Sequence, residues 1–330
     1  MSAKPAVLFF SRDPGATNQL VAVHELLCRS PKPGAPAIQA LRQCLGLKKG
    51  ECPEAAVLGR QFALDVWRAA GIEAEEHAAT VPESLLKERD IALVVTGTDD
   101  IDEPDTVDLW RTAQRAGIPV AVFLDNLVNL DVRFRTREGT LITPDLVFAL
   151  DRPSSDTLAE AGIPEDRLHV TENLHLARLA RLAERHKDAR ASLRAAWGAD
   201  DDARVVLFAA ENTAEMAALG RPAPWDEHLL LRAFTSDLAI GRPLGGVDPA
   251  KNEVVVVIRP HPRDPPGKYD GYRREEPPRI LISSQGTPLE AILAADLVVG
   301  MDSALLFEAR ALGRRALSFV QNSKFNALTG

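Results

Sequence analysis

The sequence has few of the features that mark several common classes of protein. Its 330 residues include only three cysteines, Cys28, Cys44 and Cys52, all in the first sixth of the chain. Their spacing fits no zinc motif, and an odd number does not build a disulfide framework. No run approaches the ~20 apolar residues of a membrane span, and the apolar part of MSAKPAVLFFSRD is too short for a signal peptide. We therefore expect a cytoplasmic protein with reduced thiols and no transmembrane segment.

Positive charge is also in short supply. The chain has 39 Lys and Arg against 47 Asp and Glu, which gives a formal net charge of −8. Because affinity for phosphate backbones and anionic membranes comes largely from Lys and Arg, we expect no nucleic-acid or membrane partner. In such an acidic chain, a local cationic turn says more about function than it would in a basic one.

What the chain does contain is a regular alternation of apolar runs and amphipathic stretches. Its length predicts two domains of roughly 150 residues, and 45% apolar with 26% charged residues is typical of a globular protein. Continuous apolar strands between helices indicate parallel sheets covered on both faces. The expected strands are 6–11, 55–59, 91–97, 118–125 and 144–150 in the first half, and 204–210, 253–258, 279–284, 296–301 and 315–320 in the second.

The predicted fold is therefore α/β, with two Rossmann-like parallel-sheet domains. A long charged helical region, roughly 174–197, separates the halves, and we divide the chain into 1–172 and 173–330. Two such domains leave a cleft at the carboxyl ends of their strands, where parallel sheets bind ligands. We expect a helix from about Thr17, and irregular loops at 34–49 and 243–252.

The stretch VVVVIRPHPRD is the most informative motif. A buried strand runs directly into a turn in which two prolines bracket His261, with Arg259 and Arg263 beside it. Proline fixes φ near −65°, so the imidazole is held in one direction, and guanidinium groups match phosphate geometry. We expect this turn to bind an anion at the carboxyl edge of the second sheet; the alternative is a rigid turn whose arginines are only solvated.

A second motif follows the strand at 296–301. Asp302 and Ser303 precede a helix, where an N-cap leaves backbone N–H groups available to an anion. Glu308 lies one to two turns into that helix, within reach of sugar hydroxyls. An ordinary capped helix with an exposed glutamate would give the same pattern.

Together the two motifs resemble a known superfamily. R-x-H-P at 259–262 and D-S-x-x-x-x-E-A-x-x-L-G at 302–313 are similar to the nucleotide-binding half of GT-B glycosyltransferases. The nearest branch contains CDP-glycerol glycerophosphotransferases and capsule-polysaccharide transferases. VTENLHLARL at 170–179 also resembles the V-T-G-N-x hinge of this superfamily, which includes UDP-N-acetylglucosamine 2-epimerases, although Glu172 replaces the usual glycine.

The resemblance implies roles for the second domain. Arg259 and His261 would bind the phosphates of a nucleotide, with Arg263 and Asp302 beside them. Ser303 would cap the phosphate site and Glu308 would hold the ribose. The loop AAENTAEM lies in the usual phosphate-proximal position, which makes Asn212 and Thr213 candidates; Glu211 would repel phosphate unless it contacts sugar or base. A plain helix cap by Asn212 or Thr213 is the alternative.

The first domain would then carry the acceptor and a general base. SRDPGATNQ places Asp13, Gly15 and Asn18 after the first strand, where Asp13 is positioned to deprotonate a hydroxyl and glycine allows close approach. The alternative is an Asp-Pro-Gly turn with Thr17 capping a helix. Further candidates end other strands: Asp99, Asp100, Asp125 and Asn126. No histidine accompanies these carboxylates and GT-B enzymes do not require a metal, so we expect neither metal nor cofactor.

We expect a GT-B glycosyltransferase-like enzyme. It would move a glycosyl or glycerol-phosphate-type group from a cytidine or uridine nucleotide to an acceptor hydroxyl, as in polysaccharide biosynthesis. A non-hydrolysing UDP-sugar 2-epimerase and a catalytically silent nucleotide-sugar-binding subunit remain alternatives. GT-B chains commonly end with a helix that crosses back to the first domain, whereas only QNSKFNALTG follows the last predicted strand. The transferred group, the acceptor and the oligomeric state stay open.

Overall fold

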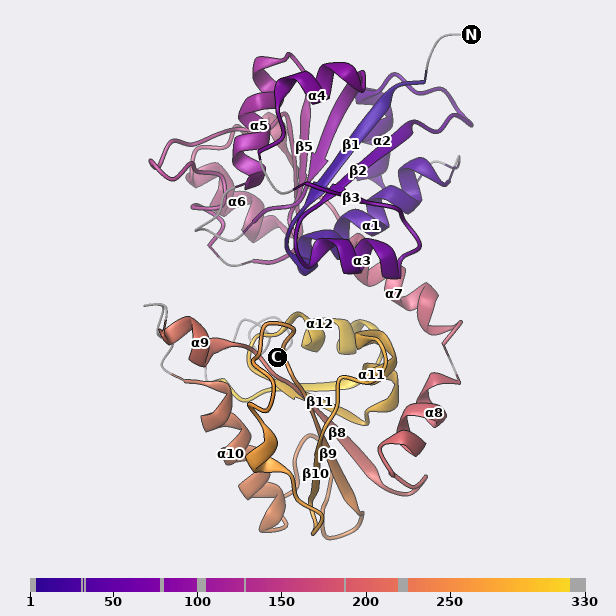
Figure 1. Cartoon of the computed structure of the whole chain (residues 1–330), viewed down its shortest axis with the longest axis vertical. Coiled ribbons are helices and arrows are strands. Elements are labelled where there is room, and N and C mark those ends of the chain that lie inside the picture. Colours follow the sequence, from indigo (N-terminus) through magenta and orange to yellow (C-terminus); the bar gives the residue numbers. More distant parts are fainter. Residues whose placement is uncertain are drawn as a thin grey trace. The chain divides into compact units, whose positions relative to one another are not determined.

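The computed structural model describes residues 4–30, 32, 34–77, 80–99, 105–127, 129–186, 188–218 and 225–320. The chain divides into two compact units, Met1–Ala177 and Arg178–Gly330 (Figure 1). Each unit is built on a parallel sheet with helices on both faces. None of the helices among these residues has the length and apolar character needed to cross a membrane.

The first unit contains a seven-stranded sheet in the order β3-β2-β1-β4-β5-β6-β7, with every pairing parallel. Side chains alternate between the two faces of a strand, and both faces are buried here. Val7 and Phe9 of β1 therefore enter one core, while Leu8 and Phe10 enter the other. The strands are β1 Ala6–Ser11, β2 Glu54–Gly59, β3 Glu75–Glu76, β4 Ile91–Thr96, β5 Val120–Phe123, β6 Leu146–Ala149 and β7 Leu168–Val170.

Helices cover both faces of this sheet. On one face α1 (Pro14–Cys28), α2 (Pro36–Cys44) and α3 (Ala63–Ala69) pack through apolar side chains such as Trp67. The other face is covered by α4 Glu83–Glu88, α5 Asp105–Arg115 and α6 Arg152–Glu160. A short 3₁₀ segment, Glu165–Arg167, leads into β7, and α7 spans Leu174–Ala183.

The second unit has a five-stranded parallel sheet in the order β10-β9-β8-β11-β12. Its strands are β8 Arg204–Ala209, β9 Val254–Arg259, β10 Arg279–Ile282, β11 Leu297–Gly300 and β12 Arg315–Ser318. One face packs against α8 Ala189–Ala196, α11 Pro288–Ala294 and α12 Ala304–Ala311, and the other against α10 Glu227–Ala239. The remaining elements are α9 Thr213–Ala218 and the 3₁₀ segment Asp270–Tyr272.

The predicted fold class is confirmed, and each of the ten expected strands is present. The expectation of an irregular loop at 34–49 is wrong. Pro36 begins α2, whose Ile38 and Leu41 are buried against the first core, so helical spacing of apolar residues outweighs the basic composition. Residues 243–252 do form turns without a helix or strand. The roles given to 1–172 and 173–330 stay predictions.

Two helix predictions also need correction. The first helix begins at Pro14 rather than near Thr17, because proline fits the first helical turn and Asp13 is the N-cap residue. The Asp-Pro-Gly turn is therefore wrong. The region expected to be one charged helix at 174–197 contains two helices. The first, α7, ends at Ala183, and the second, α8, begins at Ala189. Residues 321–330, where a crossover helix would follow the last strand, lie outside the described residues.

Candidate functional site

An aspartate cluster, Asp13, Asp99 and Asp125, forms at the carboxyl edge of the first sheet. Its members follow β1, β4 and β5, which are neighbours in the sheet, so their side chains gather at one place. Burial is the main cause of the raised pKa of Asp99 and of Asp125, and the negative charge of Asp13 adds to the rise of both. The three positions expected from the sequence are thus brought together. Asp100 lies outside the described residues.

Asp99 is the most deeply buried member of the cluster, at 3% exposed. Its Oδ2 accepts the N–H of Thr106 in α5 at 2.7 Å, and its Oδ1 has no hydrogen-bond partner among the described residues. Burial, with the charge of Asp13, raises the pKa of Asp99 to about 7. A carboxyl group in this state changes protonation near neutrality, as a general acid or base must.

Asp125 is held by polar neighbours from three segments. Asn126 donates to its Oδ2 at 3.3 Å and the Thr98 hydroxyl to its Oδ1 at 3.4 Å, while Arg133 Nη1 lies 4.0 Å from Oδ1. Burial raises the pKa of Asp125, although the Arg133 charge opposes this. A Cβ added to Gly15 would lie 2.4 Å from Asp125 Oδ2, so glycine leaves room for this carboxylate.

Two arginines contact the aspartate cluster, and neither of them was assigned a predicted role from the sequence. Arg12 Nε lies 3.5 Å from Asp13 Oδ1, and Arg12 is 5% exposed. Arg133 donates to the Thr98 hydroxyl at 2.9 Å and to the Asp99 carbonyl at 3.3 Å. The place of Arg12 directly after β1 was a usable signal. Arg133 comes many residues after β5, and no local pattern marks it. Asn18 is half-buried on α1.

In the second unit, His261 lies at the carboxyl edge of the sheet after β9. Its backbone N–H donates to Asp264 Oδ2 at 2.7 Å, and its Nδ1 accepts the Arg263 N–H at 3.2 Å. Because Nδ1 is an acceptor, the proton of the neutral ring is on Nε2. Burial lowers the pKa of His261. The ring is thus a neutral, oriented donor through Nε2–H.

Arg259 is directed to the neighbouring loop. Its Nη1 donates to the Gln285 carbonyl at 3.2 Å and its Nη2 to the Gly286 carbonyl at 2.9 Å. These bonds fasten the end of β9 to the connection between β10 and α11. Arg263 is exposed on the His261 turn. Phosphate binding by either arginine stays a prediction.

A carboxylate from the loop after the neighbouring strand β8 lies at the N-terminus of α12. Ser303 is its N-cap residue, and its Oγ accepts the Leu305 N–H at 3.3 Å. Glu211, after β8, accepts the Asp302 N–H through Oε1 at 2.9 Å. Burial raises the pKa of Glu211 to about 7, although the Asp302 N–H opposes this. Glu308 lies buried in the helix at 7% exposed.

The loop between β8 and α9 supplies the remaining candidates. The Thr213 hydroxyl donates to Glu227, which also accepts the Ala214 N–H at 3.2 Å. Thr213 is therefore engaged at the start of α9. Asn212 is half-buried beside it. Since β9, β8 and β11 are neighbouring parallel strands, the loops that follow them all lie at the carboxyl edge of this sheet. These loops carry His261, Glu211 and Ser303.

Comparison with solved structures shows the same fold at low sequence identity. A UDP-GlcNAc 2-epimerase from Methanocaldococcus jannaschii, in complex with UDP-GlcNAc and UDP, matches with a TM-score of 0.62 at 15% identity, over 98% of this chain and 86% of that one. The HepE protein of Anabaena, in complex with UDP-glucose, matches with a TM-score of 0.52 at 14% identity, over 98% and 82%.

A glycosyltransferase from Rickettsia africae matches with a TM-score of 0.54 at 12% identity, over 96% of this chain and 79% of that one. No protein-family model and no curated protein matches the chain by sequence. The chain therefore has the two-domain α/β fold of GT-B glycosyltransferases and UDP-GlcNAc 2-epimerases.

Proposed function

We propose that this chain is an enzyme that acts on a nucleotide-activated sugar. The second unit binds the nucleoside diphosphate, and the first supplies acid–base chemistry to the reacting group. The observation that carries this proposal is the aspartate cluster, in which three carboxyl groups lie at one sheet edge and two have a raised pKa. No cofactor beyond the nucleotide-activated substrate is required.

The chemistry follows from like charges held together away from water. Carboxylates that share a buried site resist full ionisation, so one retains a proton while another stays charged. Asp99 then acts as the acid near neutrality, and Asp13 or Asp125 acts as the base that removes a proton from an acceptor hydroxyl. Arg12 and Arg133 limit the repulsion within the cluster. This arrangement favours an enzyme over a catalytically silent binding subunit.

The phosphates of the substrate fit the edge that bears His261 and Ser303. A neutral imidazole donates through Nε2–H, and the N-terminus of α12 adds backbone N–H groups and the positive end of the helix dipole. Donors fixed in this way stabilise the negative charge that develops on the leaving group, which is a nucleoside diphosphate when a sugar is transferred and a nucleoside monophosphate when a glycerol-phosphate-type group is transferred. Glu308 binds the ribose, and Arg259 reinforces the phosphate site.

We infer transfer of the sugar, or of a glycerol-phosphate-type group, to an acceptor hydroxyl as the reaction. One observation favours a second candidate, 2-epimerisation of a UDP-sugar. Removal and return of a proton at C2 needs both an acid and a base, and the aspartate cluster offers both. The UDP-GlcNAc 2-epimerases among the structural neighbours are consistent with this candidate.

The first experiment is calorimetric titration of the wild type and H261A with CMP, CDP, UMP, UDP, GDP and ADP. We expect binding of a nucleoside diphosphate that H261A weakens about tenfold, equivalent to ~1.4 kcal/mol. Cytidine preference supports the CDP-glycerol-type branch, and uridine preference supports the UDP-sugar candidates. Absence of binding to every nucleotide would overturn the proposal.

The second experiment separates the two reactions. The enzyme is incubated with UDP-GlcNAc in D₂O, and the products are followed by proton NMR. Epimerisation gives the C2 epimer with deuterium at C2, whereas transfer releases UDP only when an acceptor alcohol is present and leaves C2 protonated. For a cytidine-specific enzyme, CDP-glycerol replaces UDP-GlcNAc, and transfer of glycerol phosphate to the acceptor alcohol then releases CMP. D13N and D125N are assayed in both reactions, and at least one of the two substitutions abolishes turnover if the aspartate cluster is catalytic.

A further inference from the structure

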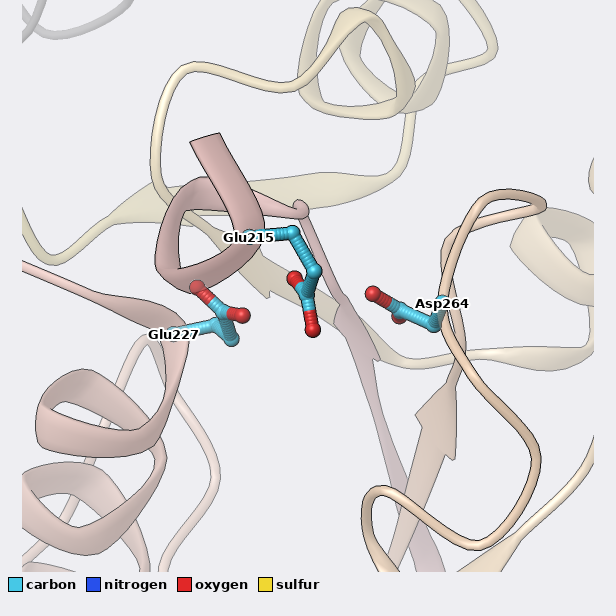
Figure 2. Close-up of side chains that lie close together, drawn as sticks. All are labelled: Glu215, Glu227 and Asp264. Atoms are coloured by element: carbon cyan, nitrogen blue, oxygen red, sulfur yellow. The ribbon is translucent and has the colours of Figure 1, made fainter. Parts of the chain in front are cut away.

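Three carboxylates meet beneath the His261 turn. Glu215 of α9, Glu227 of α10 and Asp264 of the turn point toward a common centre (Figure 2). Lys268 fills that centre: its Nζ lies 2.6 Å from Glu215 Oε2 and 2.7 Å from Asp264 Oδ1, and it also donates to Glu227. The ammonium group thus occupies the place that a divalent cation would need.

This Lys268 cluster is buried. The side chains of Lys268, Glu227 and Asp264 are 5%, 0% and 1% exposed, and that of Glu215 is 33% exposed. Burial lowers the pKa of Lys268, but its hydrogen bonds to the three carboxylates outweigh this and raise it. An ammonium group has three donors and no acceptor, so one lysine satisfies three carboxylates. The lysine is therefore charged and fully engaged.

The two fully buried carboxylates, Asp264 and Glu227, each use their second oxygen to accept hydrogen bonds from a loop. Asp264 Oδ2 accepts the His261 N–H at 2.7 Å and the Tyr269 hydroxyl at 3.1 Å. Glu227 accepts the Thr213 hydroxyl and the Ala214 N–H at the start of α9. Lys268 thus connects the turn after β9 to the loop after β8, the two loops that carry His261 and Glu211.

We propose that Lys268 is a positioning residue that holds these two loops in the arrangement that receives the nucleotide phosphates. This inference rests on the proposed function. Lys268 acts through Asp264 and Glu227 and does not touch the nucleotide. Loss of its charge leaves the buried carboxylates without a counterion, so the His261 turn rearranges and the imidazole loses its fixed direction.

The binding test uses UDP, or CDP if the wild type prefers it, and three variants in calorimetry. K268M is expected to weaken binding at least tenfold, and K268R to recover it to within about threefold of the wild type, because arginine keeps the charge. K251M is the matched control: Lys251 is also ion-paired, to Asp248 at 2.8 Å, but is 79% exposed. Its affinity should match the wild type. Equal affinity of K268M and wild type would overturn the inference.

A spectroscopic readout separates positioning from a general loss of structure. Nitrogen-15 NMR of the imidazole, assigned by comparison with H261A, should show a neutral ring protonated at Nε2 in the wild type. K268M should show a mixture of both tautomers while circular dichroism remains that of the folded protein. An unchanged His261 signal in folded K268M would overturn the inference. If K268M does not fold, D264N is tested instead. D264N is expected to bind the nucleotide at least threefold more weakly and to show a mixture of both His261 tautomers.

Failure of the inference and failure of the proposed function are distinguishable. A wild type that binds no nucleotide overturns the proposed function, and a phosphate-positioning role for Lys268 falls with it. The NMR comparison then still shows whether Lys268 fixes the imidazole. A wild type that binds nucleotide, with K268M binding equally well, overturns only the role of Lys268.

Discussion

Asp125 lies against the backbone of Gly15, with its Oδ2 2.4 Å from the point where a Cβ on Gly15 would be. The φ of Gly15 is not positive, so alanine fits the helix and only the carboxylate has to move. We expect G15A to change the free energy of unfolding by less than about 1 kcal/mol and to lower kcat roughly 100-fold, the contribution typical of a positioned acid or base.

Activity assays and urea denaturation of G15A check this expectation. G271A is the matched control, because a Cβ at Gly271 meets no atom within 4 Å and its φ is also not positive. D125N gives the activity that remains without the carboxylate. Full activity of G15A would show that the position of Asp125 does not matter for turnover.

Asp99 should make stability depend on pH. Burial and the Asp13 charge raise its pKa from 3.8 to about 7, so the folded protein keeps a proton that the unfolded chain releases. Its stabilising contribution is fully present below pH 3.8 and is lost as the pH rises to about 7. Relative to D99N, the wild type should lose about 1.4 kcal/mol per pH unit, on the order of 4 kcal/mol in total.

Denaturant unfolding of wild type and D99N between pH 4 and 8 measures this difference. D65N serves as control, since the Asp65 side chain is 76% exposed and its replacement should change stability only slightly. Parallel stability curves for wild type and D99N would contradict a raised pKa.

Glu211 should make nucleotide binding weaker as the pH rises, just as Asp99 should make the fold less stable. Burial raises its pKa to about 7, so the carboxyl group is neutral at pH 6 and charged at pH 8, where it would repel the phosphate proposed to bind at the N-terminus of α12. Wild-type affinity for the nucleoside diphosphate should fall up to about tenfold per pH unit above 7. E211Q should remove this fall, because the amide oxygen still accepts the Asp302 N–H.

Calorimetry at pH 6, 7 and 8 with both proteins tests the role of Glu211. The proton taken up on binding, measured in buffers of different ionisation enthalpy, gives a second readout. E276Q is the control, because the Glu276 side chain is 80% exposed. If E211Q and wild type lose affinity in parallel, Glu211 does not face the phosphates.

Asp296 should be a principal stabiliser of the second unit. Arg190 and Arg194 donate to it at 2.7 and 3.0 Å, and the Val205 N–H donates at 2.9 Å, so one carboxylate joins α8 to the sheet. Its replacement leaves the two guanidinium groups without their counterion. We expect D296N to lower the free energy of unfolding by about 3 kcal/mol.

Urea denaturation of D296N is compared with that of D237N. Asp237 pairs with Arg242 at 2.7 Å, but the arginine is 63% exposed, and such pairs contribute less than about 1 kcal/mol. Equal free energies of unfolding of D296N and D237N would show that burial of the Asp296 ion pairs adds nothing to stability.

Much of the fold could be predicted because buried parallel strands are continuous apolar runs. The same topology explains why candidate residues were found: a residue directly after a strand lies at the carboxyl edge of its own sheet whatever the helices do. Asp13 and Asp125 lie at this edge of the first sheet, and His261 lies at this edge of the second. The two strands that were missed, β3 and β7, have two and three residues, too few to show a pattern.

The remainder of the site depends on contacts distant in sequence. Arg133 Nη1 lies 4.0 Å from Asp125 Oδ1, and no spacing in the sequence signals this contact. Lys268 meets Glu227 across 41 residues. Arg259 lies where the motif placed it, yet its direction is set by the carbonyls of another loop. Such partners become visible only in three dimensions.

The exclusively parallel pairing of both sheets has a consequence for how fast the chain folds. β1 begins at Ala6, but its partners begin at Glu54 and Ile91, so the central pairings close long loops before they contribute any energy. In the second unit, β9 (Val254–Arg259) pairs with β8, which begins at Arg204. Until that loop closes, the valine-rich segment of β9 lacks this partner and is prone to associate with other chains. Slow refolding and aggregation at high concentration should therefore accompany this architecture, and dilution or a chaperone should raise the yield.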